Sequence, residues 1–196
     1  LPWQSQGIAL VDFEGGAPGC PNGTAEIRTV VTGTAPKGSY TGVKFTLGLP
    51  FDLNHGDPAT ALSPLDLTEM SWAWQYGYKF LRLDVNTTGQ PGGWFVHLGS
   101  NGCNGTSFDQ PPTDCTLPNA AEIVLANLDP TTDTVIADIG TFYAASNVDS
   151  NTAATAPGCM SDNTDPECST ILPALGVSLV NGAPLPTQAL FSSSAP

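Results

Sequence analysis

The sequence predicts a mainly β protein, an antiparallel β-sandwich-like single domain over residues 1–196 with long disulfide-stapled loops and little helix. Short apolar segments with period-two alternation recur at close spacing, which is typical of a sandwich. Turn-forming residues separate these segments, since the chain contains 21 glycines and 18 prolines. Only 12% of the residues are charged, which favours a secreted, loop-rich β protein over a cytosolic helical one.

The alternating segments predict six strands, over residues 7–13, 25–35, 40–49, 71–85, 93–100 and 121–130. Residues 133–146 predict a strand that runs into a short helix, and single helical turns are expected within 65–70 and before Pro173. The connection at 86–93 is of the hairpin type, so the strands on either side of it should pair antiparallel.

Strand periodicity also predicts which side chains share a face. In the strand at 71–85, Trp72, Trp74 and Tyr76 should lie on one face, although the following glycine suggests a bulge. In the strand at 93–100, His97 should lie opposite Trp94.

The charge balance excludes several partners. Five Lys and Arg against 18 Asp and Glu give a formal charge of −13, which argues against nucleic acid and anionic membrane surfaces. No run is long and apolar enough for membrane insertion. A G-x-S-x-G elbow, an H-E-x-x-H motif and a phosphate-binding glycine loop are all absent, so we do not expect an enzyme.

The cysteines predict two local disulfides, Cys103 with Cys115 and Cys159 with Cys168, both in loops rich in Gly, Asn, Asp and Pro. A four-thiolate zinc site is the alternative, but neither pair has the C-x2-C spacing. These two pairs leave Cys20 as the odd cysteine of this chain. Disulfides imply an oxidising compartment, so we expect a mature, exported chain at the cell surface or in the periplasm.

The two histidines, His55 and His97, are the candidate metal ligands. Neutral imidazole is a common ligand for copper as well as zinc, and two imidazoles are enough for Cu(I), which tolerates two-coordination. The plainer interpretation, which the residues alone favour, is that His55 is a loop residue bonded to backbone and His97 is a half-buried strand residue.

Aromatic and acidic residues suggest a rival function. Paired tryptophans are ordinarily core residues, but Trp72 and Trp74 could also form a carbohydrate platform or a cation cage, or one could be modified beside a metal. The acidic loops at 52–57 and 161–167 could hold Ca2+ through oxygen ligands, or simply form turns. The alternative is therefore a non-catalytic surface module that binds calcium or carbohydrate.

Five ordered motifs carry a resemblance to a known family. They are LVDFEGG-x-x-G-C (10–20), KFTLGLPFDLNHGDPATA (44–61), SWAWQYGYKFLRLD (71–84), FVHLGSNGC (95–103) and APGCMSDNTDPEC (156–168). Together they resemble the methanobactin-associated MbnP-like family and the MopE and CorA copper-binding proteins of methanotrophs.

The resemblance implies an exported β-rich protein that binds one Cu(I) for copper acquisition or handling. In that family, two histidines and a kynurenine, an oxidised tryptophan, hold the metal, and a di-haem peroxidase-like partner is associated with the oxidation. His55 in LNHGDPAT and His97 in VHLGS match the family's histidine motifs. The modified residue is expected among Trp74, Trp72 and Trp94, in that order.

Overall fold

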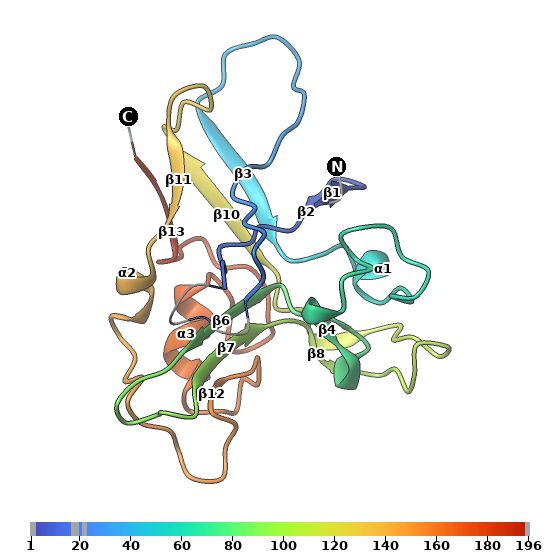
Figure 1. Cartoon of the computed structure of the whole chain (residues 1–196), viewed down its shortest axis with the longest axis vertical. Coiled ribbons are helices and arrows are strands. Elements are labelled where there is room, and N and C mark those ends of the chain that lie inside the picture. The colour runs from blue at the N-terminus through green and yellow to red at the C-terminus, as the bar shows by residue number, and fades with distance from the viewer. Residues whose placement is uncertain (1–2, 17–19, 21–22, 195–196) are drawn as a thin grey trace. The chain divides into compact units, whose positions relative to one another are not determined.

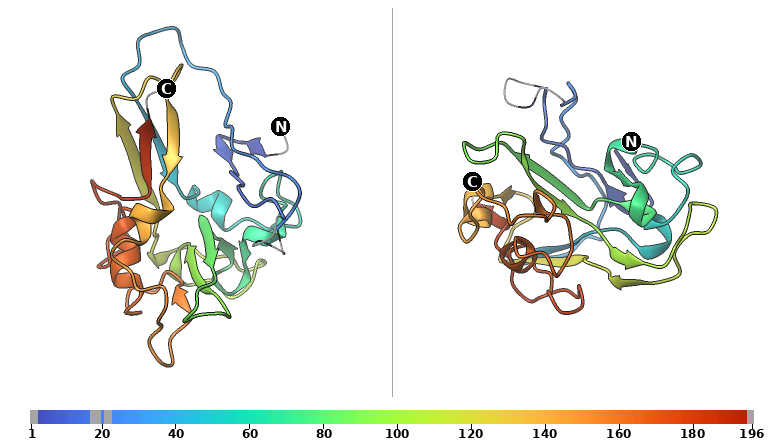
Figure 2. Two further views of the ribbon diagram at one scale, coloured as in Figure 1. Left: turned by 60° about the vertical axis from the view of Figure 1, so that its left-hand side comes forward. Right: turned by 90° about the horizontal axis from the view of Figure 1, so that it is seen from below.

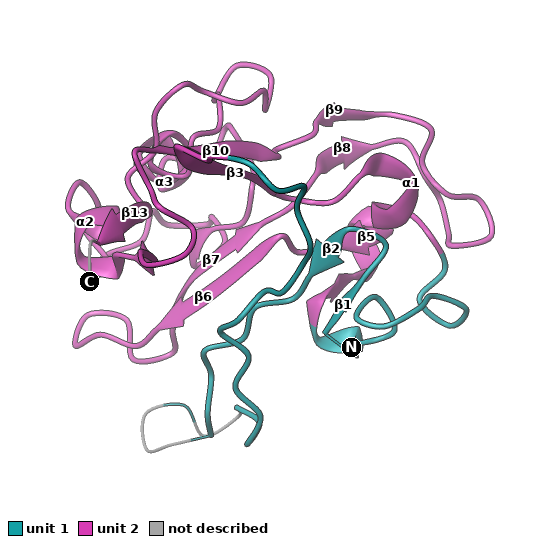
Figure 3. Ribbon diagram, turned by 90° about the horizontal axis from the view of Figure 1, so that it is seen from above, with its two compact units in different colours: residues 1–38, 57–69 teal, residues 39–56, 70–196 magenta. Residues whose placement is uncertain are grey.

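The computed structural model describes residues 3–16, 20 and 23–194, and these divide into two compact units (Figure 3). Unit 1 consists of Leu1–Gly38 and Asp57–Glu69, and unit 2 consists of Ser39–Gly56 and Met70–Pro196. The two histidines and both predicted disulfides belong to unit 2. A single domain over 1–196 stays a prediction.

Unit 1 has little regular structure. Its two short strands, β1 (Gln4–Ser5) and β2 (Ile8–Ala9), form an antiparallel hairpin. Beyond this hairpin, an isolated bridge joins Asp12 to Arg28. A 3-10 turn, η1 (Thr68–Met70), lies where the chain re-enters unit 2.

Unit 2 contains the core, which two sheets line. One sheet pairs β3 (Gly42–Leu47) with β10 (Ala121–Ala126), and these strands lie side by side in Figures 1 and 2. The other has the order β12 (Gly158–Cys159), β7 (Trp94–Leu98) and β6 (Leu81–Val85), with β12 parallel to β7. Alternate residues of all four longer strands pack into one core, as the sandwich-like prediction requires.

Three further strand pairs complete unit 2. They are β4 (Ser71–Trp72) with β5 (Gly77–Tyr78), β8 (Asn101–Cys103) with β9 (Cys115–Leu117), and β11 (Thr134–Ala137) with β13 (Phe191–Ser194).

The helices are short. α1 (Phe51–Asn54) and the 3-10 turn η2 (Ala73–Gln75) precede β5, and α2 (Ile139–Tyr143) and α3 (Cys168–Ala174) pack against the core. The Asp138 carboxylate accepts from the Thr141 N–H at 2.9 Å and so caps α2. Among the described residues, no helix has the length and apolar character needed to cross a membrane.

Several predictions are confirmed. The fold is mostly β with little helix, β6 and β7 pair antiparallel as a hairpin, and a strand runs into a short helix at α2. Both expected disulfides form, Cys103–Cys115 and Cys159–Cys168.

Two strand predictions are wrong. Residues 25–35 form no strand beyond the Arg28 bridge, and Val30 and Val31 are exposed, so this apolar segment lacks a core to pack against. The strand at 71–85 breaks into β4, η2, β5 and β6, because Tyr76 adopts a left-handed conformation with φ 49° and ψ 50°. Trp72 and Trp74 therefore do not share a face.

Candidate metal centre

His55 lies at the C-terminal end of α1 and is only 5% exposed. Its Nδ1 is 2.6 Å from the backbone oxygen of Tyr76. A carbonyl oxygen can only accept, so Nδ1 carries the proton and donates it. Nε2 therefore keeps its lone pair, and the Asn54 amide donates to it at 3.0 Å.

The break in the predicted strand places the Tyr76 carbonyl against His55. The left-handed Tyr76 follows η2 and precedes Gly77, which packs directly on the histidine. A Cβ on Gly77 would lie 2.9 Å from Asn54 Oδ1 and 3.1 Å from His55 Cε1. Glycine is thus required there by close approach, and the neighbouring turn supplies the acceptor for His55.

The Asn54 side chain organises the polar surroundings of His55. It is 2% exposed, and its Oδ1 accepts from the Tyr78 N–H at 2.9 Å. Its Nδ2 also donates to Ser100 Oγ at 3.3 Å, and Ser100 Oγ donates to the Pro118 carbonyl at 3.0 Å. Since Ser100 follows β7, Asn54 connects the segment that carries His55 with the segment that follows His97.

The Cys103–Cys115 disulfide lies beside His55. The cysteines are directly paired across β8 and β9, and Cys115 Sγ is 3.4 Å from His55 Nε2. One ligand atom from each of His55, Cys103 and Cys115 lies within 4.8 Å of the others. Among the described residues, these three are the one set of three or more His, Cys, Asp or Glu side chains whose ligand atoms are close enough to share a metal ion.

His97 lies on β7 and is held by a carboxylate. Its Nε2 donates to Asp84 Oδ1 on β6 at 2.9 Å, and the neutral ring then keeps its lone pair on Nδ1. Arg82 Nε donates to the other oxygen of Asp84 at 2.7 Å. Burial raises the pKa of Asp84, but the hydrogen bonds from His97 and Arg82 outweigh burial and hold the pKa below its ordinary value.

Buried polar groups fix the chain just after His97. Ser161 Oγ donates to the His97 carbonyl at 2.8 Å and accepts from the Gly99 N–H at 2.9 Å. The Asn119 amide donates to the Gly99 carbonyl at 2.9 Å. Both Ser161 and Asn119 are fully buried, so this turn is held from two further loops.

The structure does not bring the two imidazoles into contact. Their rings have no common hydrogen-bond partner among the described residues, and no ring contact joins them. Their neighbours do meet, because Asn54 bonds to Ser100.

The three candidate tryptophans have different surroundings. Trp72 is 7% exposed, its strand partner is Gly77, and a Cβ on Gly99 would lie 2.7 Å from its ring. Trp74 is 62% exposed and packs edge-on against Trp72 at 5.3 Å between ring centroids. Trp94 is buried in the core on the face of β7 opposite His97, as predicted, and its Nε1 donates to the Ser150 carbonyl at 3.1 Å.

The acidic loop at 161–167 uses its oxygens internally. Asp162 accepts from Thr164, and Glu167 accepts from the Thr152 N–H and hydroxyl. Burial, followed by a hydrogen bond to the Glu167 carboxylate, raises the pKa of Asp165 to about 6. These contacts are those of structured turns.

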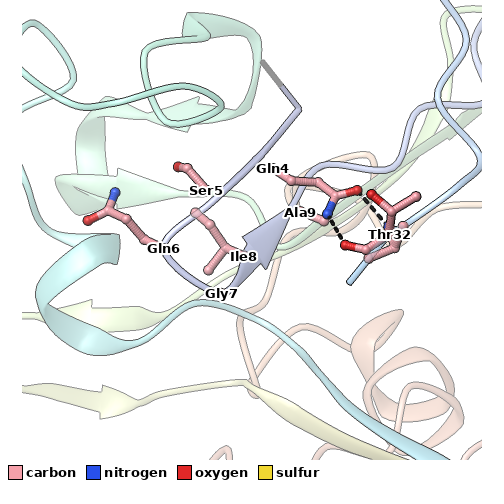
Figure 4. Close-up of a pocket in the computed structure, with 8 residues that line it drawn as sticks. Gln4, Ser5, Gln6, Gly7, Ile8, Ala9 and Thr32 are labelled. Carbon is pink, nitrogen blue, oxygen red and sulfur yellow. Dashed lines mark hydrogen bonds between the residues drawn. The ribbon is translucent and has the colours of Figure 1, made fainter. Parts of the chain in front are cut away.

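Cys20 and a separate pocket lie in unit 1. Cys20 Sγ donates to Glu14 Oε2 at 3.4 Å. A pocket of about 330 Å³ lies at the β1–β2 hairpin, where the Gln4 amide pairs with the backbone of Thr32 (Figure 4). Its lining residues are Gln4, Ser5, Gln6, Gly7, Ile8, Ala9, Val31 and Thr32, which offer no carboxylate, imidazole or thiol.

Sequence reasoning missed the groups that hold the two histidines: Asn54, Ser100, Asp84 and the Tyr76 carbonyl. The hairpin prediction could have found Asp84, because antiparallel pairing brings it diagonally opposite His97. The Tyr76 contact had no sequence signal, since it depends on a backbone carbonyl and a left-handed turn.

Comparison with known proteins identifies the family. The MbnP family model matches residues 2–161. The chain is also similar to the solved structure of MbnP from Methylosinus trichosporium, with 31% sequence identity and a TM-score of 0.86 over 100% of this chain and 78% of that one. No curated protein sequence matches the chain. The fold and the family match agree, and the chain belongs to the MbnP family.

Proposed function

We propose that this chain is an exported protein that binds one Cu(I) ion through His55 and His97 and serves copper acquisition or handling. The observation that carries the proposal is the hydrogen bonding of the two rings. Each imidazole donates one N–H, to the Tyr76 carbonyl or to the Asp84 carboxylate, which leaves one lone pair per ring. Metal-binding histidines in proteins are held in this way by a second group.

The donor set fits copper in its reduced state. Two neutral imidazoles with no fixed square plane favour Cu(I) over Cu(II), which prefers tetragonal nitrogen and oxygen sites. His55 would bind through Nε2 and His97 through Nδ1. The binding nitrogen of His55 would exchange the Asn54 hydrogen bond for the metal, while Asn54 keeps its bonds to Tyr78 and Ser100.

An oxidised tryptophan completes the proposed site. Ring opening to kynurenine exposes an aromatic amine and a carbonyl, which can serve as a weak ligand where indole offers only a donor N–H. The sequence ranks Trp74 first for the modification, but the contacts of Trp72 favour Trp72 instead. Its strand partner Gly77 packs on His55, and its ring packs on Gly99, two residues after His97. We therefore rank Trp72 first, then Trp74, with the core residue Trp94 last.

The remaining parts of the proposal concern partners and compartment. A di-haem peroxidase-like partner would carry out the oxidation, and it would reach the buried Trp72 through the exposed Trp74, whose ring packs against it. Two disulfides support an oxidising compartment, the cell surface or periplasm. We propose no catalytic residues for the chain itself.

Metal content and intact mass of the protein from its native host test the proposal together. We expect about one copper per chain retained after dialysis, and a ring-opening mass change on one tryptophan. Calcium alone would instead favour the calcium-binding surface module, and a carbohydrate ligand without metal would favour its carbohydrate-binding form. If copper is bound and all tryptophans are unmodified, kynurenine is excluded as a ligand and the site consists of the two histidines alone.

A further inference from the structure

The two disulfides of the chain have different surroundings. Cys159–Cys168 lies in the apolar core, where both cysteines are at most 1% exposed. Cys103–Cys115 instead has an imidazole against it, with His55 Nε2 3.4 Å from Cys115 Sγ. Only this disulfide has a third metal-binding atom beside it in the described chain.

We propose that reduction of Cys103–Cys115 creates a second, alternative metal site, in which the two thiolates and His55 Nε2 bind one soft monovalent cation, Cu(I). This site goes beyond the two-histidine proposal, because it does not use His97. Thiolates are soft ligands that select Cu(I), and imidazole also suits copper.

The strand pairing keeps the two sulfurs together after their bond is broken. Cys103 and Cys115 are directly opposite in β8 and β9, so their side chains leave the same face of the ladder. Asn101 pairs with Leu117 on one side, and the Asn104 N–H donates to the Asp114 carbonyl at 3.1 Å on the other. These backbone contacts do not depend on the disulfide.

The distances are close to those that a shared metal needs. With the bond lengths of tetrahedral zinc sites as a guide, a thiolate at about 2.3 Å and an imidazole at about 2.0 Å from one ion lie roughly 3.5 Å apart. The Cys115 Sγ to His55 Nε2 distance is already 3.4 Å. Once their bond is broken, the two sulfurs would separate to roughly 3.8 Å through rotation about the side-chain bonds of Cys103 and Cys115.

The histidine presents the correct nitrogen to the sulfurs. The Tyr76 carbonyl holds the proton on Nδ1, so Nε2 carries the lone pair, and Nε2 is the ring nitrogen that lies 3.4 Å from Cys115 Sγ. The Asn54 amide must release Nε2, but Asn54 stays fixed by Tyr78 and Ser100.

The redox step is balanced by an external dithiol. The dithiol gives two electrons and two protons, the S–S bond breaks to two thiols, and the dithiol leaves as its own disulfide. Binding of Cu(I) then expels the two thiol protons, and the copper does not change its oxidation state. Cys103 is half-buried whereas the other disulfide is enclosed, so a small dithiol should open Cys103–Cys115 first.

The test uses the full chain with Cys20→Ser and His97→Ala, which removes the remaining cysteine and the proposed two-histidine site. We reduce it with dithiothreitol, remove the reagent without oxygen, and titrate Cu(I) against a chromogenic chelator. Thiol alkylation and peptide mapping identify which disulfide has opened. We expect one Cu(I) per opened Cys103–Cys115, with sulfur and histidine-type nitrogen neighbours in X-ray absorption.

Matched variants separate the ligands. Adding His55→Ala should weaken Cu(I) binding at least tenfold and remove the nitrogen signal. Adding Cys103→Ser and Cys115→Ser, which leaves Cys159–Cys168 in place as the internal control, should abolish the uptake that depends on reduction.

The proposal is overturned if reduction adds no Cu(I), or if His55→Ala leaves affinity and spectrum unchanged. Either result leaves the two-histidine proposal standing, because that one is tested on the oxidised protein with His97 present. If the double cysteine variant does not fold, alkylation mapping and the His55→Ala comparison still show whether the reduced Cys103–Cys115 pair and His55 bind Cu(I).

Discussion

Each histidine is oriented by one hydrogen-bond acceptor, and the two acceptors differ in kind. A backbone carbonyl holds His55, and the Asp84 side chain holds His97. Only the Asp84 carboxylate can be removed by a side-chain substitution. A variant at Asp84 therefore tests directly how the position of the His97 ring affects metal binding.

We expect Asp84→Asn to weaken Cu(I) binding about 10–100-fold without abolishing it, because the His97 ring loses its charged acceptor and its fixed tautomer. Chelator competition measures the affinity, and the nitrogen chemical shifts of the ring report the tautomer. Asp109→Asn removes an equal charge from an exposed position and should change neither. An unaltered affinity in Asp84→Asn would show that Asp84 does not position His97.

Gly77→Ala should displace the His55–Asn54 pair, since its Cβ would lie 2.9 Å from Asn54 Oδ1. We expect a loss of about 1–3 kcal/mol in unfolding free energy, together with weaker copper binding. Gly92→Ala is the matched control, because nothing lies within 4 Å of its Cβ. Thermal unfolding and copper titration measure the two effects. Equal stability and equal copper affinity of the two variants would contradict the close packing of Gly77 on Asn54 and His55.

At the scale of elements, the hydrophobic pattern was informative where a strand had a partner and a core. The alternation of β10 matches its burial, and the hairpin of β6 and β7 has the expected facing. The pattern gave wrong strands at two places. Residues 25–35 have apolar side chains but join no sheet, and within 71–85 the backbone at Tyr76 and Gly77 turns to contact His55. Those contacts join residues far apart in sequence, so periodicity could not reveal them.

The register of β10 can be checked with adjacent residues. Ile123 is completely buried, whereas Val124 is 57% exposed. Ile123→Ala should lower the free energy of unfolding by about 2–5 kcal/mol through lost packing and a cavity, and Val124→Ala by less than about 1 kcal/mol. Denaturant unfolding measures both. Equal losses would mean that the strand does not alternate as described.

The loop before α3 should make stability depend on pH. The pKa of Asp165 is raised to about 6 in the folded chain, above its ordinary value of 3.8, so its contribution to stability is present below pH 4 and lost as pH rises through 6. The amide that Asp165→Asn introduces would donate to Glu167 as the protonated acid does. This variant should therefore be more stable than the wild type at pH 7, by about 1–2 kcal/mol once solvent screening is allowed for.

Denaturant midpoints at pH 4.5 and pH 7 give this comparison, with Asp109→Asn as the charge control. The gain from Asp165→Asn should shrink at the lower pH. A variant that is less stable than the wild type at pH 7 would show that the ionised Asp165 carboxylate is favourable in the fold.

In the whole molecule, the sequence motifs predicted the family, which the comparisons confirm, and His55 and His97 stay predicted ligands. Composition and cysteine spacing predicted the β class and both disulfides. The division of the chain into two compact units had no counterpart in the sequence pattern. The backbone carbonyl that holds the His55 ring likewise depends on how separate segments of unit 2 meet, whereas the Asp84 carboxylate reaches His97 through the predicted hairpin.

Copper titration of the oxidised protein shows whether His55 and His97 together hold one Cu(I). The chain has no other histidine, so His55→Ala and His97→Ala each leave a single imidazole. We expect one tightly bound Cu(I) per chain in the wild type under chelator competition, and none in either folded variant. Full copper occupancy in His55→Ala or in His97→Ala would contradict it.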